Sequence, residues 1–158
     1  ISDNHFQITN TIDKSISEND IIIFTGGLGP TNDDITKKTL NKYFKGKLVR
    51  DEITYNQIKK IFKRRNFDLT KKNKDQALVP DNCQVLHNIH GTAPGMAFSI
   101  KKKLVISLPG VPFEMKSLFN DKCIDLIKVK YNLPIVYHRI IKTVGICESW
   151  LSDLIGKW

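Results

Sequence analysis

A glycine-rich loop followed by two acidic residues is the part of this sequence best suited to chemistry. Its candidate phosphate-binding residues are Thr25, Gly26, Gly27, Gly29 and Thr31. Glycine lacks a Cβ, so its backbone can turn N–H groups toward a bound anion. No lysine follows the third glycine, which argues against the phosphate-binding loop of P-loop ATPases and GTPases. The loop therefore predicts a phosphate site of another type.

The acidic pair Asp33 and Asp34 has two interpretations. Thr31 and Asp34 have the spacing of a capping box, and the first turn of a helix stabilises negative charge, which alone would explain both acids. Alternatively, one of them holds a divalent metal ion, Mg²⁺ or similar, against a diphosphate, because hard cations prefer carboxylate oxygens. On this second interpretation Asp33 and Asp34 are the candidate metal ligands.

A second loop, residues 109–112, contains Gly110 and opens a predicted helix with Glu114 in its first turn. A carboxylate at that place is a candidate metal ligand or general base. Its favourable interaction with the helix dipole would explain it equally well. Both interpretations of Glu114 stay open.

Rigid elements must hold these loops in place. The unbroken β-branched and aromatic run 21–24 is typical of a strand buried in a parallel sheet. Further strands are predicted at 83–87, 96–100 and 104–108, the last two forming a hairpin, and helices at about 33–44, 51–66, 70–78 and 112–130. This alternation of helix and strand predicts an α/β fold with a mostly parallel sheet.

The break at Asn132-Leu133-Pro134 divides the predicted architecture. We expect one domain over residues 1–133 and the beginning of a small second subdomain over residues 134–158. In the latter, residues 135–144 alternate like a strand and residues 148–158 have the pattern of a helix. Because the chain does not begin with Met and ends on Trp158, we expect it to be truncated.

Composition narrows the classes of partner. The 158 residues are 41% hydrophobic and carry a formal net charge of +9, which suits a folded domain with an anionic substrate. The lysines are scattered without interleaved aromatic residues, so we expect them to be solvated and nucleic acid not to be the partner. Three separated cysteines predict neither a disulfide framework nor a zinc site and favour the cytoplasm. No apolar run reaches membrane-spanning length.

Four motifs occur in the order and spacing of one protein family. They are TGGLGPTNDDIT at 25–36, NKDQALVP at 73–80, GTAPG at 91–95 and LPGVPFEMK at 108–116. Together they resemble the competence/damage-inducible protein CinA family, whose N-terminal domain is of the molybdopterin-binding type. The resemblance covers nearly the whole chain, and residues 144–154 are similar to the segment that opens the family's next subdomain.

The resemblance implies a three-layer α/β/α sandwich, a cytoplasmic homo-oligomer, and metal-dependent hydrolysis of the diphosphate of ADP-ribose or a related nucleotide. The residues that would cradle the diphosphate are Gly26, Gly27, Gly29 and Thr31, with Gly110 and Glu114 completing the far side of the pocket. Asp34 matches an acidic residue that matters for nucleotide-dependent chemistry in the molybdopterin relatives. The resemblance therefore favours Asp34 over Asp33 as the functional acid. The implied catalytic residues are Asp34 and Glu114.

The chain also departs from the family pattern. Family members begin with a strand, a helix and a second strand bearing a Gly-[Thr/Asp]-Glu-Leu-Leu motif, and none of this precedes Ile1. We therefore expect a sheet edge beside residues 21–24 to be exposed and one wall of the site to be missing. Phe113 stands where a small residue is usual, and we expect it to narrow the pocket.

Two functions remain open for the chain. The first is the hydrolase implied by the family, an ADP-ribose pyrophosphatase, favoured by the motifs at 73–80 and 108–116. The second is a non-catalytic module that binds molybdopterin or a nucleotide. Magnesium-dependent release of AMP from ADP-ribose separates the two.

Overall fold

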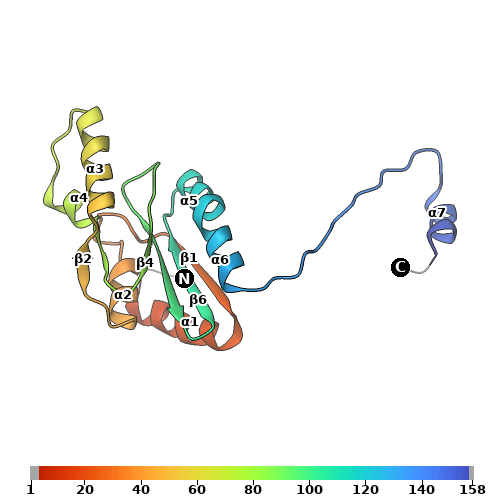
Figure 1. Ribbon diagram of the computed structural model, residues 1–158, viewed down its shortest axis with the longest axis horizontal. Helices are drawn as coiled ribbons and strands as arrows, with labels where there is room; N and C mark the ends of the chain where they lie inside the picture. Colours follow the sequence, from red (N-terminus) through yellow and green to blue (C-terminus); the bar gives the residue numbers. More distant parts are fainter. Residues whose placement is uncertain (1–3, 157–158) are drawn as a thin grey trace.

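The computed structural model describes residues 4–156, in which helices and strands alternate along the chain (Figure 1). The helices are α1 (His5–Glu18), α2 (Thr36–Tyr43), α3 (Glu52–Arg64), α4 (Lys71–Asp75), α5 (Pro112–Leu118), α6 (Ile124–Lys130) and α7 (Glu148–Ile155). The strands are β1 (Ile21–Thr25), β2 (Leu48–Arg50), β3 (Leu78–Pro80), β4 (Gln84–Leu86), β5 (Gly95–Ile100) and β6 (Lys103–Leu108). A π-helical turn, η1 (Phe119–Cys123), joins α5 to α6.

The main sheet has the strand order β1-β6-β5-β4. β1 runs parallel to β6, with Ile21 opposite Leu104 and Thr25 opposite Leu108. The other two pairs are antiparallel, so the α/β class is confirmed but the described sheet is mixed instead of mostly parallel. The reason is the length of the connections, because two residues link β5 to β6 and a link that short can join only antiparallel neighbours.

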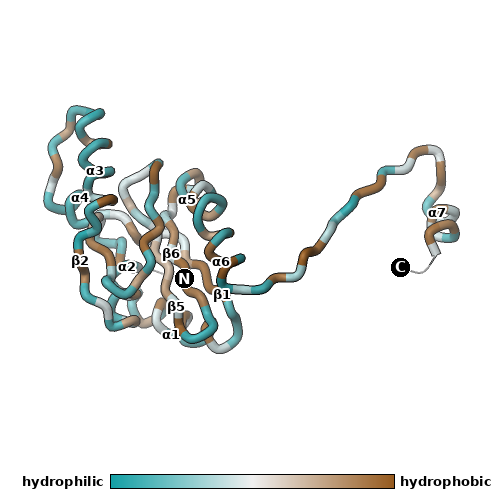
Figure 2. Tube along the Cα trace, viewed as in Figure 1, coloured by the Kyte–Doolittle hydropathy of each residue, from teal (hydrophilic) through white to brown (hydrophobic). Residues whose placement is uncertain are grey.

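Helices cover both faces of this sheet. On one face, α1 and α2 contribute buried side chains to a cluster that includes Ile8, Ile12, Leu40, Ile22, Met96, Phe98 and Val105. On the other face, α5, η1 and α6 pack over a cluster that includes Ala97, Leu104, Ile106, Leu108, Leu118 and Cys123. Figure 2 shows the apolar residues concentrated along the strands between these helices. The expected three-layer arrangement is confirmed.

β1 lies at the edge of the sheet within residues 4–156. Ile22 is buried, whereas the side chain of Ile23 is 43% exposed. Beside the strand is an open groove of about 540 Å³ whose other wall includes Ile8 and Thr11 of α1. The structure therefore has the open sheet edge that the sequence predicts beside residues 21–24.

A small antiparallel pair, β2 and β3, carries α3 and α4 on the side of the molecule away from α5 and α6 (Figure 1). The helix predicted over residues 70–78 ends at Asp75, because Leu78–Pro80 forms β3 and pairs with β2. Asp51 caps α3, since its Oδ1 accepts a hydrogen bond of 2.7 Å from the N–H of Thr54. This cap fixes the start of α3 directly after β2.

The C-terminal segment contains α7 and no strand among the described residues. The strand predicted over 135–144 is wrong, because no other strand lies beside it to satisfy its backbone groups. α7 confirms the predicted helix up to Ile155, and the end predicted at residue 158 lies outside the described residues. The boundary after residue 133 stays a prediction.

None of the helices within residues 4–156 combines the length and the apolar character needed to span a membrane.

Candidate functional site

The two predicted phosphate-binding loops meet where β1 and β6 end side by side. The N–H of Gly26 donates to the carbonyl of Leu108 over 2.9 Å. A Cβ added to Gly110 would lie only 3.2 Å from the Cα of Gly26. The structure thus brings together Gly26 and Gly110, 84 residues apart in sequence, with Thr25 exposed at the end of β1.

The glycine loop needs glycine at its first two positions. Gly26 and Gly27 have φ angles of +95° and +68°, a region that other residues rarely adopt. A Cβ on Gly27 would lie 2.1 Å from Oγ1 of Thr36, the first residue of α2. Leu28 is buried in the core and anchors the loop. The loop is therefore packed tightly against the start of α2.

Asp34 closes a turn that precedes α2. The N–H and Oγ1 of Thr31 donate to Oδ2 of Asp34 over 2.8 and 2.5 Å. α2 begins only at Thr36, and its N-cap residue Ile35 makes no side-chain cap. The helix predicted from Asp33 and the cap predicted at Thr31 are therefore wrong, because the hydrogen bond from Asp34 N to Thr31 O closes a separate turn before the helix.

The carboxylate of Asp34 is held in its ionised form. Partial burial alone would raise its pKa, but hydrogen bonds from Thr31 and Gly29 and the positive charge of Lys37 outweigh burial, so the pKa lies below its usual range. A Cβ on Gly29 would approach Oδ2 of Asp34 to 2.7 Å. Gly29 thus leaves room for the carboxylate, which joins Gly29, Thr31 and Asp34 in one cluster.

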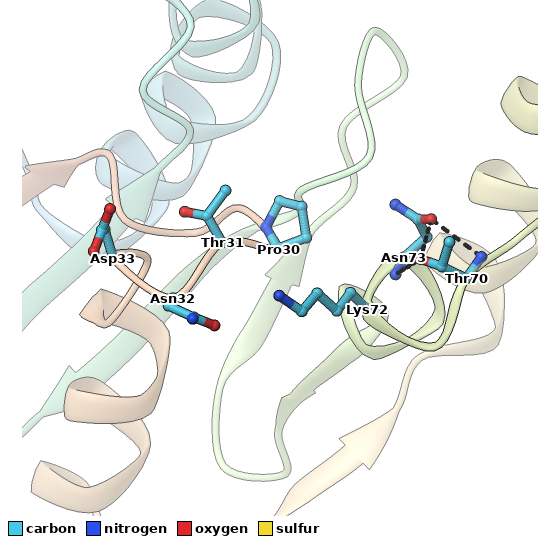
Figure 3. A pocket seen from close by; sticks show the side chains of 7 residues that line it. All are labelled: Pro30, Thr31, Asn32, Asp33, Thr70, Lys72 and Asn73. Carbon is cyan, nitrogen blue, oxygen red and sulfur yellow. Dashed lines mark hydrogen bonds between the residues drawn. The ribbon is translucent and has the colours of Figure 1, made fainter.

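Asp33 lies on the exposed side of the same loop. It lines an open cavity of about 630 Å³ between residues 30–33 and α4 (Figure 3). Across this cavity, Lys72 extends from α4 toward the loop. Thr70 and Asn73 hold the start of α4 in a reciprocal capping box. Lys72 is a cationic group that the sequence analysis did not single out.

Lys37 links the glycine loop region to residues 75–78. Its Nζ donates to the carbonyls of Gln76 and Leu78 over 3.1 and 3.0 Å. Burial lowers the pKa of Lys37 to about 8, against the opposing effect of Asp75 and Asp34. The interpretation of this lysine as a solvated surface residue is therefore wrong. The pattern of α2 alone cannot show that a distant segment folds over it.

Glu114 lies in the first turn of α5, as predicted, and is held by Asn88. Nδ2 of Asn88 donates to Oε2 of Glu114 over 2.6 Å and to the carbonyl of Ala93 over 3.0 Å. A Cβ on Gly91 would lie 2.1 Å from Oε2 of Glu114. The loop that contains the GTAPG motif is therefore folded directly against this carboxylate.

Asn88 is the residue of this region that the sequence analysis missed. Its side chain is only 6% exposed, and its Oδ1 accepts from the N–H groups of His90 and Gly91 over 3.0 and 3.1 Å. Both ends of the amide are thus satisfied. One sequence feature could have indicated its role: it is an asparagine at the start of a glycine-containing loop, where hydrogen bonds from side chain to backbone are common.

The predicted metal ligands do not form a ready cage. Asp34 and Glu114 belong to separate hydrogen-bond clusters, and within residues 4–156 no three His, Cys, Asp or Glu side chains gather in a metal-binding arrangement. Mg²⁺ commonly uses one or two carboxylates and completes its octahedron with water and substrate phosphates. Asp34, alone or with Asp33, fits that kind of shared site.

Comparison with known proteins identifies the family. Residues 1–128 match a family described as a probable molybdopterin binding domain. The solved structure of CinA from Thermoplasma acidophilum, titled a protein of unknown function, is 34% identical with a TM-score of 0.68, covering 79% of this chain and 73% of that one. The chain belongs to the CinA family.

Curated relatives agree with this assignment to the CinA family. A CinA-like protein of Cytophaga hutchinsonii is 46% identical over 158 residues, which is 100% of this chain and 38% of the relative. A putative competence-damage inducible protein of Caldicellulosiruptor saccharolyticus is 39% identical over 157 residues, with 99% and 38% covered. The chain thus spans 38% of the length of these CinA relatives, and the resemblance carried by its four motifs is confirmed.

Proposed function

We propose that this chain carries the site for metal-dependent hydrolysis of the diphosphate of ADP-ribose or a related nucleotide. The observation that carries the proposal is the approach of Gly26 and Gly110 at the adjoining carboxyl ends of β1 and β6. In α/β sheets the crevice beyond the carboxyl ends of parallel strands is where ligands bind. Glycine at both positions lets the two loops approach each other closely at that edge of the sheet.

Positive charge beside the glycine loop supports an anionic ligand. Lys37, Lys38 and Lys72 line a cavity of about 310 Å³ together with Asp34 and the loop residues 29–32. Cations around a concave site raise the local concentration of a phosphate-bearing substrate. The excess of nine positive charges over the whole chain acts in the same direction.

The acidic residues take complementary roles in this proposal. Asp34 is ionised because of its hydrogen bonds to Thr31, so it acts as a fixed carboxylate and not as a proton donor. When bound there, a divalent metal ion would neutralise charge on the phosphate oxygens. Glu114, oriented by Asn88, is the second candidate carboxylate and would orient the attacking water. As part of the same proposal, the protein acts in the cytoplasm.

A non-catalytic module is the second candidate. It is favoured by the separation of Asp34 and Glu114 into two hydrogen-bond clusters and by the lack of a three-residue metal group within residues 4–156. In that case the loops would hold the phosphate of molybdopterin or of a nucleotide without hydrolysis. The family description, a probable molybdopterin binding domain, is compatible with this alternative.

The experiment is an assay of AMP release from ADP-ribose by chromatography, with and without Mg²⁺. We expect Asp34→Asn to lower the magnesium-dependent rate about 100-fold or more, as for loss of an essential carboxylate, while circular dichroism stays unchanged. Asp68→Asn is the matched control, because Asp68 is exposed and lines neither cavity beside the glycine loop. Equal activity of the wild type and Asp34→Asn would show that Asp34 has no catalytic role. Binding of ADP-ribose by the wild type without release of AMP would favour the non-catalytic binding module.

A further inference from the structure

Most of the excess positive charge of the chain lies on α3, α4 and the loop between them. Residues 59–75 contain eight basic and two acidic residues, a net charge of +6 out of +9 for the whole chain. The two helices contact each other and lie side by side in Figure 1. The fold therefore joins their cations into one α3–α4 basic surface, formed by the exposed side chains of Lys59, Lys60, Lys63, Arg64, Arg65, Lys71, Lys72 and Lys74.

Four of these cations share the outer side of α3. Ile58 of α3 is fully buried, and with 3.6 residues per turn the opposite side of the helix carries Lys59, Lys60, Lys63 and Arg64. Residues four apart on a helix are about 6 Å apart along its axis. A row of positive charges at this spacing suits a chain of phosphates better than a single anion.

The cations of this surface are not neutralised by the protein. None of the eight forms a salt bridge with an acidic side chain within residues 4–156. Neighbouring like charges repel each other, and they attract small counterions from solution. A polyanion that replaces those counterions gains free energy from their release.

An aromatic ring stands among the cations. The side chain of Phe67, in the loop between α3 and α4, is 67% exposed. Its backbone is fixed, because Asn66 has a φ angle of +53° and the N–H of Phe67 donates to the carbonyl of Phe62 over 3.1 Å, as in a Schellman motif. The loop therefore presents an apolar ring in water between two groups of positive charge.

The combination of cations and ring favours one class of polyanion. Sequence alone predicts that these lysines bind no nucleic acid, because they are scattered and lack interleaved aromatic residues, but the fold gathers them around Phe67. Charge alone would also suit an acidic protein, whereas an exposed ring among cations is a platform on which nucleobases stack. A membrane is less suitable, because helices that bind lipid keep their apolar side free and Ile58 of α3 is packed in the interior.

We propose that the α3–α4 basic surface binds single-stranded nucleic acid. The cations contact phosphates, and Phe67 stacks on an unpaired base. This binding does not depend on the hydrolysis proposed above, because the outer side of α3 and Phe67 line neither cavity beside the glycine loop.

The test is fluorescence anisotropy of a labelled thymidine oligonucleotide of about 12 nucleotides, a length that one small domain can cover. The 158-residue chain is titrated into it at several salt concentrations. We expect the affinity to fall steeply with salt, and a strand of equal length without bases to bind at least fivefold more weakly. No binding of the oligonucleotide, equal binding of the strand without bases, or binding to phosphatidylserine vesicles alone would overturn the inference.

Two triple variants locate the charge contacts. Changing Lys63, Arg64 and Arg65 to Gln should weaken the oligonucleotide at least tenfold and reduce the slope of log K against log salt by about 2, since each phosphate contact on a single strand contributes about 0.7. The control changes the exposed Lys116, Lys122 and Lys128 to Gln. It alters the net charge equally, so equal effects of the two triple variants would overturn the inference.

A pair of single variants tests the ring. Phe67→Ala should weaken the oligonucleotide at least fivefold and leave the strand without bases unaffected, because only stacking is lost. Phe6→Ala is the matched control, since Phe6 on α1 is 72% exposed. Circular dichroism checks that each variant is folded, and unchanged affinity of a folded Phe67→Ala would overturn the inference.

Discussion

At the scale of single residues, the site depends on close packing of carboxylates against glycine. The Cβ position of Gly91 lies 2.1 Å from Oε2 of Glu114, and that of Gly29 lies 2.7 Å from Oδ2 of Asp34. In each pair the glycine supplies space that no other residue could leave. The two acids therefore have fixed positions although both belong to loops or to the first turn of a helix.

Gly91→Ala tests this packing at Glu114. The added methyl group would displace the flexible end of Glu114 and break its hydrogen bond to Asn88, so we expect catalytic activity or ligand affinity to fall about tenfold or more. The free energy of unfolding should change by no more than about 1 kcal/mol, because a side chain and not the backbone moves away. Urea denaturation and the AMP assay measure the two effects, and a large loss of stability with full activity would contradict the expectation.

The buried Lys37 gives a pH-dependent prediction. Its pKa is about 8 in the folded chain and near 10.5 when unfolded, so the unfolded chain binds more protons between these values and stability rises with pH. The titration of Lys37 should raise the free energy of unfolding by about 1 kcal/mol between pH 7 and pH 9. Lys37→Met should lack the rise, and Lys38→Met, an exposed neighbour, should keep it.

Urea denaturation at several pH values between 7 and 9 measures this difference. Changes that other groups contribute, such as the thiol of Cys123, whose pKa burial raises to about 11, are common to all three proteins and cancel in the comparison. Parallel curves for the wild type and Lys37→Met would show that Lys37 titrates normally.

At the scale of elements, the ends of helices and strands set where the functional groups lie. α3 begins at the Asp51 cap, and the same carboxylate contacts His87 in the segment before the GTAPG motif. Burial tends to raise the pKa of Asp51, but bonds from Thr54 and His87 outweigh it and lower the pKa. One residue thus couples the start of α3 to the segment that contains His87.

Asp51→Ala should destabilise the fold by about 1–2 kcal/mol, as measured for loss of helix N-caps. Since the folded pKa of Asp51 is depressed, its contribution is present at neutral pH and fades as the pH falls below about 4. The difference in unfolding free energy between wild type and variant should shrink accordingly. Asp68→Ala, at an exposed position outside any helix, is the control, and equal effects of the two changes would refute the capping role.

Some of these elements can be predicted from the sequence and others cannot. β1 and the β5–β6 hairpin follow from apolar runs and a lysine-rich turn, and Glu114 falls in the predicted first turn of α5. The start of α2 cannot be predicted from the sequence, because the pairing of Thr31 with Asp34 is compatible with either a helix cap or a separate turn. Hydrogen bonds over long sequence separation, such as Asn88 to Glu114, leave no local pattern.

At the scale of the whole molecule, the sheet ends on an unpaired strand. β1 has a neighbour on one side only within residues 4–156, and an exposed apolar edge is a template for pairing with another chain. The homo-oligomer that the family resemblance implies stays a prediction. The edge offers one route by which two copies of this chain could associate.

Ile23→Lys tests that route. A charged side chain on the edge strand should weaken association between copies, so the sedimentation coefficient of the variant should depend less on concentration than that of the wild type. Val129→Lys places the same charge on an exposed position of α6 and should behave like the wild type. Identical sedimentation of all three proteins would exclude β1 as the contact.

We propose that the loops meeting at Gly26 and Gly110 hold a diphosphate for hydrolysis. Calorimetric titration with ADP-ribose, with and without Mg²⁺, followed by chromatography of the same mixture for AMP, tests it most directly. We expect magnesium-dependent binding accompanied by release of AMP. Absence of binding under both conditions would contradict it, and binding without AMP would leave a phosphate-binding module without catalysis.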